Sequence, residues 1–138
     1  MGDGIMIFFG APEATGDREQ ALRAVRMGLE MQARMGALCE KWTRVGVEEP
    51  FTIRIGINTG VASVGSFGAQ GRMDYTAIGR QVNLAARLQA SCDPGSILIS
   101  HATWVLVRDD IPCAPKGELH LKGFIRPVNV YEVIVTRD

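Results

Sequence analysis

Two polar residues, Asn83 and Arg87, stand four apart in a segment whose apolar spacing predicts a helix over residues 80–91. Residues four apart leave the same side of a helix, about one turn from each other. An arginine guanidinium offers fixed donors that match a phosphoryl group, and an amide beside it could hold a sugar oxygen. Spacing alone favours the plainer alternative, a solvated arginine and an asparagine without a role, because such pairs are common.

Two further charged residues could serve the same kind of ligand. Asp3 lies between two glycines at the mouth of a predicted strand, where a carboxylate could hold a divalent cation such as Mg²⁺ or Mn²⁺. Lys122 follows the apolar-polar alternation of residues 119–121 and could point an ammonium at a phosphate. Each has a plain alternative: a turn aspartate that accepts from a backbone amide, and an edge-strand lysine that discourages aggregation.

No arrangement for covalent catalysis is visible. The serines lack a G-x-S-x-G setting, and His101 and His120 have no partner suggested by spacing, so both histidines are interpreted as structural. Residues 65–68 are glycine-rich but lack the GK[ST] ending of a phosphate-binding P-loop. The candidate chemistry therefore rests on the amide, the guanidinium, the carboxylate and the ammonium described above.

The first half of the chain predicts strands around one long helix. Residues 5–9 form an apolar run typical of a buried strand, closed by a glycine and a proline. Residues 17–45 carry apolar side chains at spacings of three and four, which predicts an amphipathic helix whose Met and Trp residues pack in the core. Residues 51–57 alternate as a half-buried strand does, and a turn joins them to residues 61–64 in a predicted antiparallel hairpin.

The second half repeats this mixture. Residues 97–99 predict a buried strand, and Ser100 is a candidate cap for a short helix that ends near residue 108. Residues 117–123 and 128–135 predict a final strand pair. Helices and strands interleave with hairpins among them, so we expect an α+β fold with a mainly antiparallel sheet packed with helices.

Composition narrows the functional classes. The 138 residues suit one domain, and 46% hydrophobic against 22% charged residues is an ordinary globular composition. Lys+Arg 15 balance Asp+Glu 15, and no local basic stripe is present, so nucleic acid is not an expected partner. No repeat or linker divides the chain.

Cysteine content and hydropathy predict the compartment. The 3 cysteines are widely spaced, with no CxxC pair and no histidine at a zinc spacing, which favours a reducing cytosol. The longest strongly apolar stretch, residues 5–11, is far shorter than the roughly 20 residues that span a bilayer. We expect a cytoplasmic chain without a membrane segment, or the cytosolic domain of a larger membrane-attached or sensor-linked protein.

Four ordered motifs, taken together, closely resemble the catalytic domain of the class III nucleotidyl (adenylate/guanylate) cyclases, in a bacterial form. The resemblance covers nearly the whole chain, so we expect residues 1–138 to form one such catalytic domain without its N-terminal part. The motifs are GDGIMIFFG around Asp3, RIGINTG from Arg54, RMDYTAIG leading into VNLAARL from Val82, and LKG around Lys122. Their order and separation are far more specific than any one of them.

The resemblance implies a reaction and a role for each candidate. The 3′-oxygen of ATP or GTP attacks its own α-phosphate, giving a 3′,5′-cyclic nucleotide and pyrophosphate, with two divalent metal ions (Mg²⁺ or Mn²⁺) as cofactors. Asp3 matches the second of two metal-binding aspartates, and Asn83 the residue that orients the ribose. Arg87 matches the residue that stabilises the transition state, and Lys122 the lysine that binds the terminal phosphates.

The residue matched to base recognition favours adenine. Thr76 stands seven residues before Asn83. At the matching position adenylyl forms often carry Asp, or in many bacterial members Thr or Ser, whereas guanylyl forms often carry Cys. A threonine hydroxyl can accept from the adenine amino group. We therefore expect an adenylate cyclase domain that makes cyclic AMP for intracellular signalling. The alternatives are a guanylate cyclase and an inactive cyclase-like domain that binds nucleotide or regulates a partner.

The resemblance also implies that part of the family's domain precedes this chain. The expected fold is the ferredoxin-like cyclase fold lacking its first strand and helix, and with them the first metal aspartate and the base-reading lysine. The fragment itself is therefore expected to be inactive or weakly active. Family members share each active site between two subunits, which implies a homodimer. A purely structural ferredoxin-like module is the remaining alternative.

Overall fold

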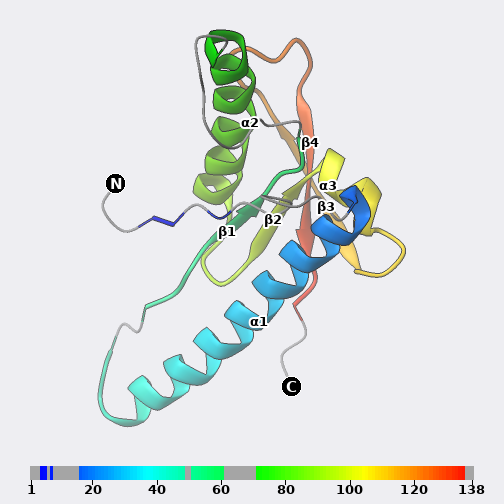
Figure 1. Ribbon diagram of the computed structural model, residues 1–138. Coiled ribbons are helices and arrows are strands. Elements are labelled where there is room, and N and C mark those ends of the chain that lie inside the picture. The colour runs from blue at the N-terminus through cyan, green and yellow to red at the C-terminus, as the bar shows by residue number, and fades with distance from the viewer. Residues whose placement is uncertain (1–3, 6, 8–15, 49–50, 61–70, 136–138) are drawn as a thin grey trace.

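The computed structural model describes residues 4–5, 7, 16–48, 51–60 and 71–135, and for residues 71–78 it describes the backbone alone (Figure 1). Three helices and four strands alternate along the chain. They are α1 (Asp17–Arg44), β1 (Ile55–Ile57), α2 (Gly71–Ser91), β2 (Ile97–Ser100), α3 (His101–Val107), β3 (Cys113–Leu119) and β4 (Val128–Val133).

The four strands form one sheet in the order β1-β2-β4-β3. The neighbours β1 and β2 run parallel, with Ile55 opposite Ile97, and α2 makes the crossover between them. The pairs β2–β4 and β3–β4 are antiparallel. Two of the three strand pairs are thus antiparallel, which confirms the predicted α+β fold with a mainly antiparallel sheet.

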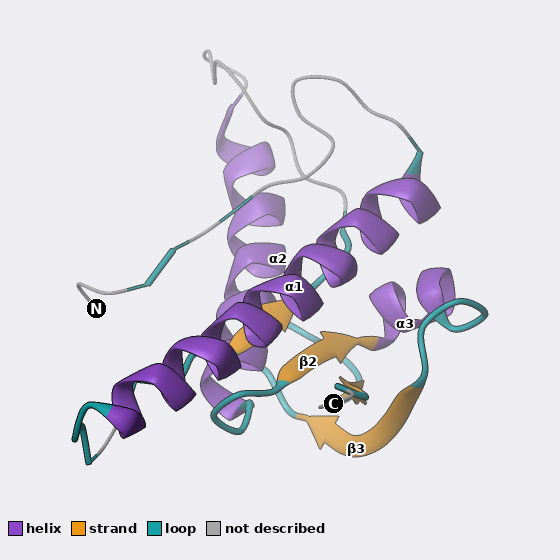
Figure 2. Cartoon of the chain, turned by 90° about the horizontal axis from the view of Figure 1, so that it is seen from below, coloured by secondary structure: helices purple, strands orange, loops and turns teal. Residues whose placement is uncertain are grey.

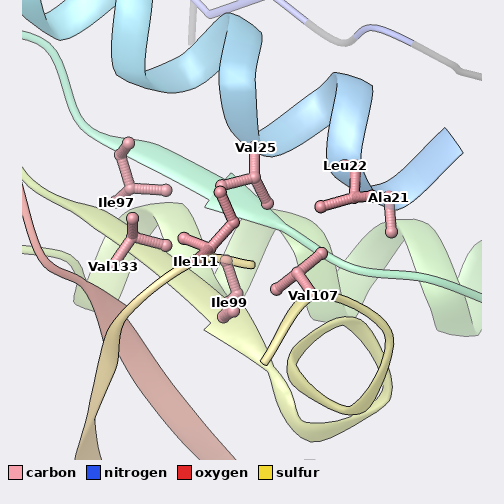
Figure 3. Packing of buried hydrophobic residues seen from close by; sticks show 8 residues of the cluster. All are labelled: Ala21, Leu22, Val25, Ile97, Ile99, Val107, Ile111 and Val133. Atoms are coloured by element: carbon pink, nitrogen blue, oxygen red, sulfur yellow. The ribbon is translucent and has the colours of Figure 1, made fainter. Parts of the chain in front are cut away.

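Helices cover both faces of this sheet, and the alternation along β2 shows which helix lies on which face (Figures 1 and 2). Ile97 and Ile99 pack in a core cluster with the first half of α1 and with α3 (Figure 3). Leu98 points the other way and packs in a second cluster against α2. The molecule therefore has a helix–sheet–helix arrangement, with α1 and α3 on one face and α2 on the other.

The long helix α1 confirms the predicted boundaries but not the predicted burial. Its buried residues all lie between Ala21 and Gln32. The Gln32 amide closes this buried part, because its Nε2 donates to the carbonyls of Ile53 (3.1 Å) and Ser96 (3.0 Å) at the entrance of two strands. Beyond it the helix runs past the sheet, as Figure 1 shows, so none of the remaining helix residues is buried.

The expected core packing of the Met and Trp residues of α1 is therefore wrong for its second half. Leu38 is 40% exposed, and Trp42 makes an edge-on contact with Phe51, which is itself 77% exposed. The apolar spacing continues where the described sheet has ended. Periodicity reports which side of a helix is apolar, whereas burial needs a surface for that side to meet.

Several strand and helix predictions change in extent. Ile5 and Ile7 are exposed and not in a strand, so the predicted buried strand is wrong for these two residues, and its other members lie outside the described residues. Residues 61–64, the second arm of the predicted hairpin, also lie outside them. The helix α2 begins earlier than expected, at Gly71, and β3 ends at Leu119 instead of extending to residue 123.

The short helix α3 confirms its predicted cap. Ser100 has an extended backbone, and its side-chain oxygen accepts from the Thr103 amide, so it satisfies a donor that the first turn leaves free. Among the described residues, no helix is long and apolar enough to cross a membrane.

Candidate functional site

The helix α2 carries two of the candidate site residues, Asn83 and Arg87. Both are exposed, whereas Leu84 and Leu88, one position further along, are buried against the sheet. The four-residue spacing holds over this regular helix, so both polar side chains leave the same, outward side of α2. The structure thus keeps the amide and the guanidinium together and in reach of a ligand.

Lys122 lies in the turn between β3 and β4, not in a strand, so the edge-strand alternative is wrong. The side chains of Leu121 and Phe124, on either side of it, are partly buried and pack on the cluster that contains Leu84 and Leu88 of α2. This packing anchors the turn on the side of the sheet that α2 covers, while Lys122 itself stays exposed. The ammonium is therefore carried by a segment that packs on the same core cluster as the helix bearing Asn83 and Arg87.

The structure describes only part of the predicted site. Thr76 lies in α2, about two turns before Asn83, and its side chain is outside the described part of the chain. Asp3 is outside the described residues altogether. In those residues no group of three or more His, Cys, Asp or Glu side chains could hold a metal ion. The metal assignment of Asp3 therefore stays a prediction.

A polar network that sequence reasoning missed joins the ends of β1 and β2 to α2. Asn58, the residue after β1, donates through Nδ2 to the side-chain oxygen of Gln81 (2.8 Å) and to its main-chain carbonyl (3.1 Å). The Asn58 Oδ1 accepts from the hydroxyl of Ser100 at the end of β2 (2.8 Å). The only sequence signal was the position of Asn58 in a turn after a strand; its partners are 23 and 42 residues away.

The same network continues into α3. Thr103, which is fully buried, lies with its hydroxyl 2.9 Å from that of Thr59 and donates to the carbonyl of Ile57 at 3.4 Å. In the described residues, no buried side-chain nitrogen or oxygen lacks a partner. The network is thus fully satisfied, which makes it a rigid joint instead of a source of strain.

A pocket of about 260 Å³ lies at the far end of α2, between its last turn and strands β3 and β4. Lys116 and Glu132 line it as an ion pair of 2.9 Å, which lowers the pKa of the Glu132 carboxyl and raises that of the Lys116 ammonium. Burial raises the pKa of the Cys92 thiol in its wall, so that thiol stays protonated and is a poor nucleophile. Neither Asn83, Arg87 nor Lys122 lines this pocket.

Comparison with known proteins identifies the family. Residues 1–135 match the sequence profile of the adenylate and guanylate cyclase catalytic domain. Adenylate cyclase 1 of Rhizobium meliloti (strain 1021) is 37% identical over 135 residues, which cover 96% of this chain and 20% of that protein. The chain therefore spans about a fifth of the length of this curated relative.

Solved structures agree with this match. The adenylyl cyclase CyaB from P. aeruginosa superimposes with a TM-score of 0.79 at 49% identity, over 94% of this chain and 66% of that one. The guanylyl cyclase Cya2 superimposes with a TM-score of 0.78 at 35% identity, over 100% of this chain and 68% of that one. With the four sequence motifs and this fold, the match shows that the chain belongs to the class III adenylate and guanylate cyclase catalytic domain family.

Proposed function

We propose that this chain is part of an adenylate cyclase that converts ATP into 3′,5′-cyclic AMP and pyrophosphate. The observation that carries the proposal is the joint exposure of Asn83 and Arg87 on the outward side of α2, with Lys122 on the turn that packs beside that helix. The relatives named above include adenylate cyclases that are 37% and 49% identical to the chain.

Each residue has a distinct task in this reaction. A new bond forms between the ribose 3′-oxygen and the α-phosphorus, and the 3′-hydroxyl proton passes to water. The bond from that phosphorus to the bridging oxygen breaks, and pyrophosphate leaves with its electron pair. Asn83 orients the ribose so that the 3′-oxygen is in line with the leaving group. Arg87 donates to the α-phosphate oxygens, where charge is redistributed in the transition state, and Lys122 binds the terminal phosphates.

Base recognition is assigned to Thr76, whose hydroxyl can accept a hydrogen bond from the adenine amino group. This assignment favours ATP over GTP. A guanylate cyclase is the second candidate, supported by the 35% identity to the guanylyl cyclase Cya2.

The metal chemistry of this family depends on two divalent ions, which favour ionisation of the 3′-hydroxyl and neutralise phosphate charge when bound. Asp3 is the ligand that the chain contributes in our proposal. One carboxylate does not make a site for two ions, and the described residues supply no other ligand set. The tasks of Asn83, Arg87 and Lys122 therefore involve the nucleotide directly.

The 138-residue chain alone is proposed to have little or no turnover, because it covers only 66% of the solved CyaB chain and carries one of the two metal aspartates.

We further propose a cytoplasmic homodimer in which Asp3 of one subunit and Asn83 and Arg87 of the other share a site. If so, Asp3→Ala and Arg87→Ala proteins, each inactive, should regain activity when mixed in a longer form of the domain. Mixtures that stay inactive would argue against shared sites.

The decisive experiment is product analysis on the chain extended upstream of Met1 by the preceding coding sequence, here called the extended domain. It is incubated with Mn²⁺ and either ATP or GTP, with Arg87→Ala as the control. Cyclic AMP that disappears in the control would support the reaction, the base preference and the role of Arg87 together. Cyclic GMP would favour the second candidate, and nucleotide binding without any cyclic product would mean a degenerate, regulatory domain.

A further inference from the structure

The attachment of α2 to the sheet combines two kinds of contact. Most of it is apolar: Leu84 and Leu88, with Cys92 just after the helix, share one core cluster with Leu98 and Val130 of the sheet. Apolar contacts are not directional, so they hold the helix against the sheet but specify its rotation and its axial position only loosely. Directional side-chain contacts between α2 and the end of β1 come, among the described residues, from Asn58 alone, whose amide donates to two oxygens of Gln81.

The contact at Gln81 also bears on where α2 places Asn83 and Arg87. At 3.6 residues per turn, Leu84 and Leu88 lie within about 60° of Gln81 around the axis, whereas Asn83 and Arg87 lie at least about 120° away. The network therefore grips the inner side of α2 while the two ligand-binding residues occupy the outer side. Any rotation or sliding of the helix at Gln81 is passed directly to Asn83, two residues later.

Asn58 is itself held in one orientation. The Ser100 hydroxyl accepts from the Thr103 amide, which leaves its proton for the Asn58 oxygen at 2.8 Å. With Oδ1 engaged in this way, the Nδ2 of the same amide must face Gln81. The Gln81 side chain also lies close to the backbone of Gly60. A Cβ added at Gly60 would lie 2.4 Å from that side chain, so little free space remains for Gln81 to move on this side.

We propose that Asn58 is a positioning residue for the cyclase reaction: through Gln81 it sets the rotation and axial position of α2, and thereby aims Asn83 and Arg87 at the ribose and the α-phosphate. The proposal rests on the function proposed above. It assigns Asn58 no contact with the nucleotide.

The test compares Asn58→Asp with two controls in the extended domain. The new carboxyl has nearly the same shape and still accepts from Ser100, but it turns an acceptor toward both Gln81 oxygens. Asn129→Asp makes the same substitution at an exposed position of β4. Thr103→Val removes a buried hydroxyl from the same network. That hydroxyl lies 2.9 Å from the Thr59 hydroxyl and 3.3 Å from the Ser100 hydroxyl, donates to the Ile57 carbonyl, and does not bond to α2.

A change in the rotation or axial position of α2 should slow the chemical step more than it weakens substrate binding. We expect Asn58→Asp to lower kcat for ATP by about 100-fold, while KM changes by about threefold or less. Thr103→Val should lower Tm yet keep kcat within about threefold of the parent, and Asn129→Asp should change neither. Equal loss of kcat in Asn58→Asp and Thr103→Val, or an unchanged kcat in Asn58→Asp, would overturn the proposal.

Two further measurements cover the other outcomes. If Asn58→Asp does not fold, Gln81→Leu removes one of the two acceptors and should lower kcat by about 10-fold, with Gln89→Leu on the same helix as its control. Equal kcat in these two variants would overturn the proposal.

If the parent extended domain makes no cyclic product, the proposed function fails, and hydrogen exchange on the 138-residue chain then tests the positioning itself. Asn58→Asp should speed exchange in residues 79–91 and Thr103→Val in residues 101–107; the same pattern in both would reject it.

Discussion

The two sides of α2 differ in what they do. The inner side is built from Leu84, Leu88 and Gln81, which contact the sheet and the turn after β1. The outer side presents Asn83 and Arg87, which are exposed and have no side-chain hydrogen bond to any described residue. The residues that pack and the residues that bind the ligand thus lie on opposite sides of the same helix. Substitutions on the inner side should therefore affect stability, and substitutions on the outer side should affect activity.

The largest effect is expected on the outer side. Arg87→Ala in the extended domain should lower kcat for ATP by about 10³-fold, the scale found when a transition-state donor is removed. Its Tm should stay close to that of the parent, because the guanidinium is exposed. Steady-state kinetics with a thermal melt measures both quantities. A parallel fall in Tm would show that the two sides are not separable.

The opposite pattern is expected for Leu88→Ala on the inner side. Leu88 is fully buried, so its truncation leaves a cavity and should lower the free energy of unfolding by about 2–5 kcal/mol. Urea denaturation of the 138-residue chain measures this loss. Ala86→Gly, on the same helix, should cost only about 1 kcal/mol from helix propensity. If Leu88→Ala cost no more than this control, the packing described for α2 would be contradicted.

A smaller effect is expected where α2 meets the strand that it crosses. A Cβ on Gly56 would lie 2.4 Å from the Gln89 nitrogen and 2.7 Å from the Ala85 carbonyl oxygen, both backbone atoms. Gly56→Ala should therefore push α2 outward and destabilise the chain by about 1–3 kcal/mol, which urea denaturation measures. Gly36→Ala is the matched control: apart from the neighbouring backbone of its own helix, no atom would lie within 4 Å of a Cβ added there, and a helical alanine should stabilise by about 0.5–1 kcal/mol. Equal stability of the two variants would contradict the close approach at Gly56.

The smallest effect is expected in the second half of α1, which carries the apolar pattern but has no buried residue beyond Gln32. Leu38→Gln should change the free energy of unfolding by about 0.5 kcal/mol or less, because the side chain is 40% exposed. Val25→Thr, in the buried half of the same helix, should cost about 1–3 kcal/mol, since it replaces a buried methyl group with a hydroxyl that loses its contact with water. Similar losses from both in urea denaturation would mean that Leu38 is covered in solution.

Local pattern was enough for several elements. The apolar spacing of three and four located α1 within a residue of its ends, and Ser100 was identified as a cap because its type and its place after a buried strand suit that role. The four-residue spacing of Asn83 and Arg87 is sufficient by itself to put both on one side of a helix. These are short-range properties, which the sequence holds within one or two turns.

Other features depend on residues that are distant in the sequence, and only the tertiary structure decided them. No residue of α1 beyond Gln32 is buried, because the helix extends past the described sheet there, although the apolar periodicity of the helix continues. Packing of Leu121 and Phe124 on the core cluster shared by α2 and the sheet accompanies the placement of Lys122 in a turn and not in a strand. The joint between Asn58, Gln81 and Ser100 arises where two parallel strands end beside the crossover helix.

The sequence by itself determined the family, the helix that carries Asn83 and Arg87, and the residues matched to the reaction, because motif identity and helical spacing are local. The tertiary structure decided which apolar residues are buried and how α2 is aimed, because both depend on the distance and direction between segments that the chain order does not specify.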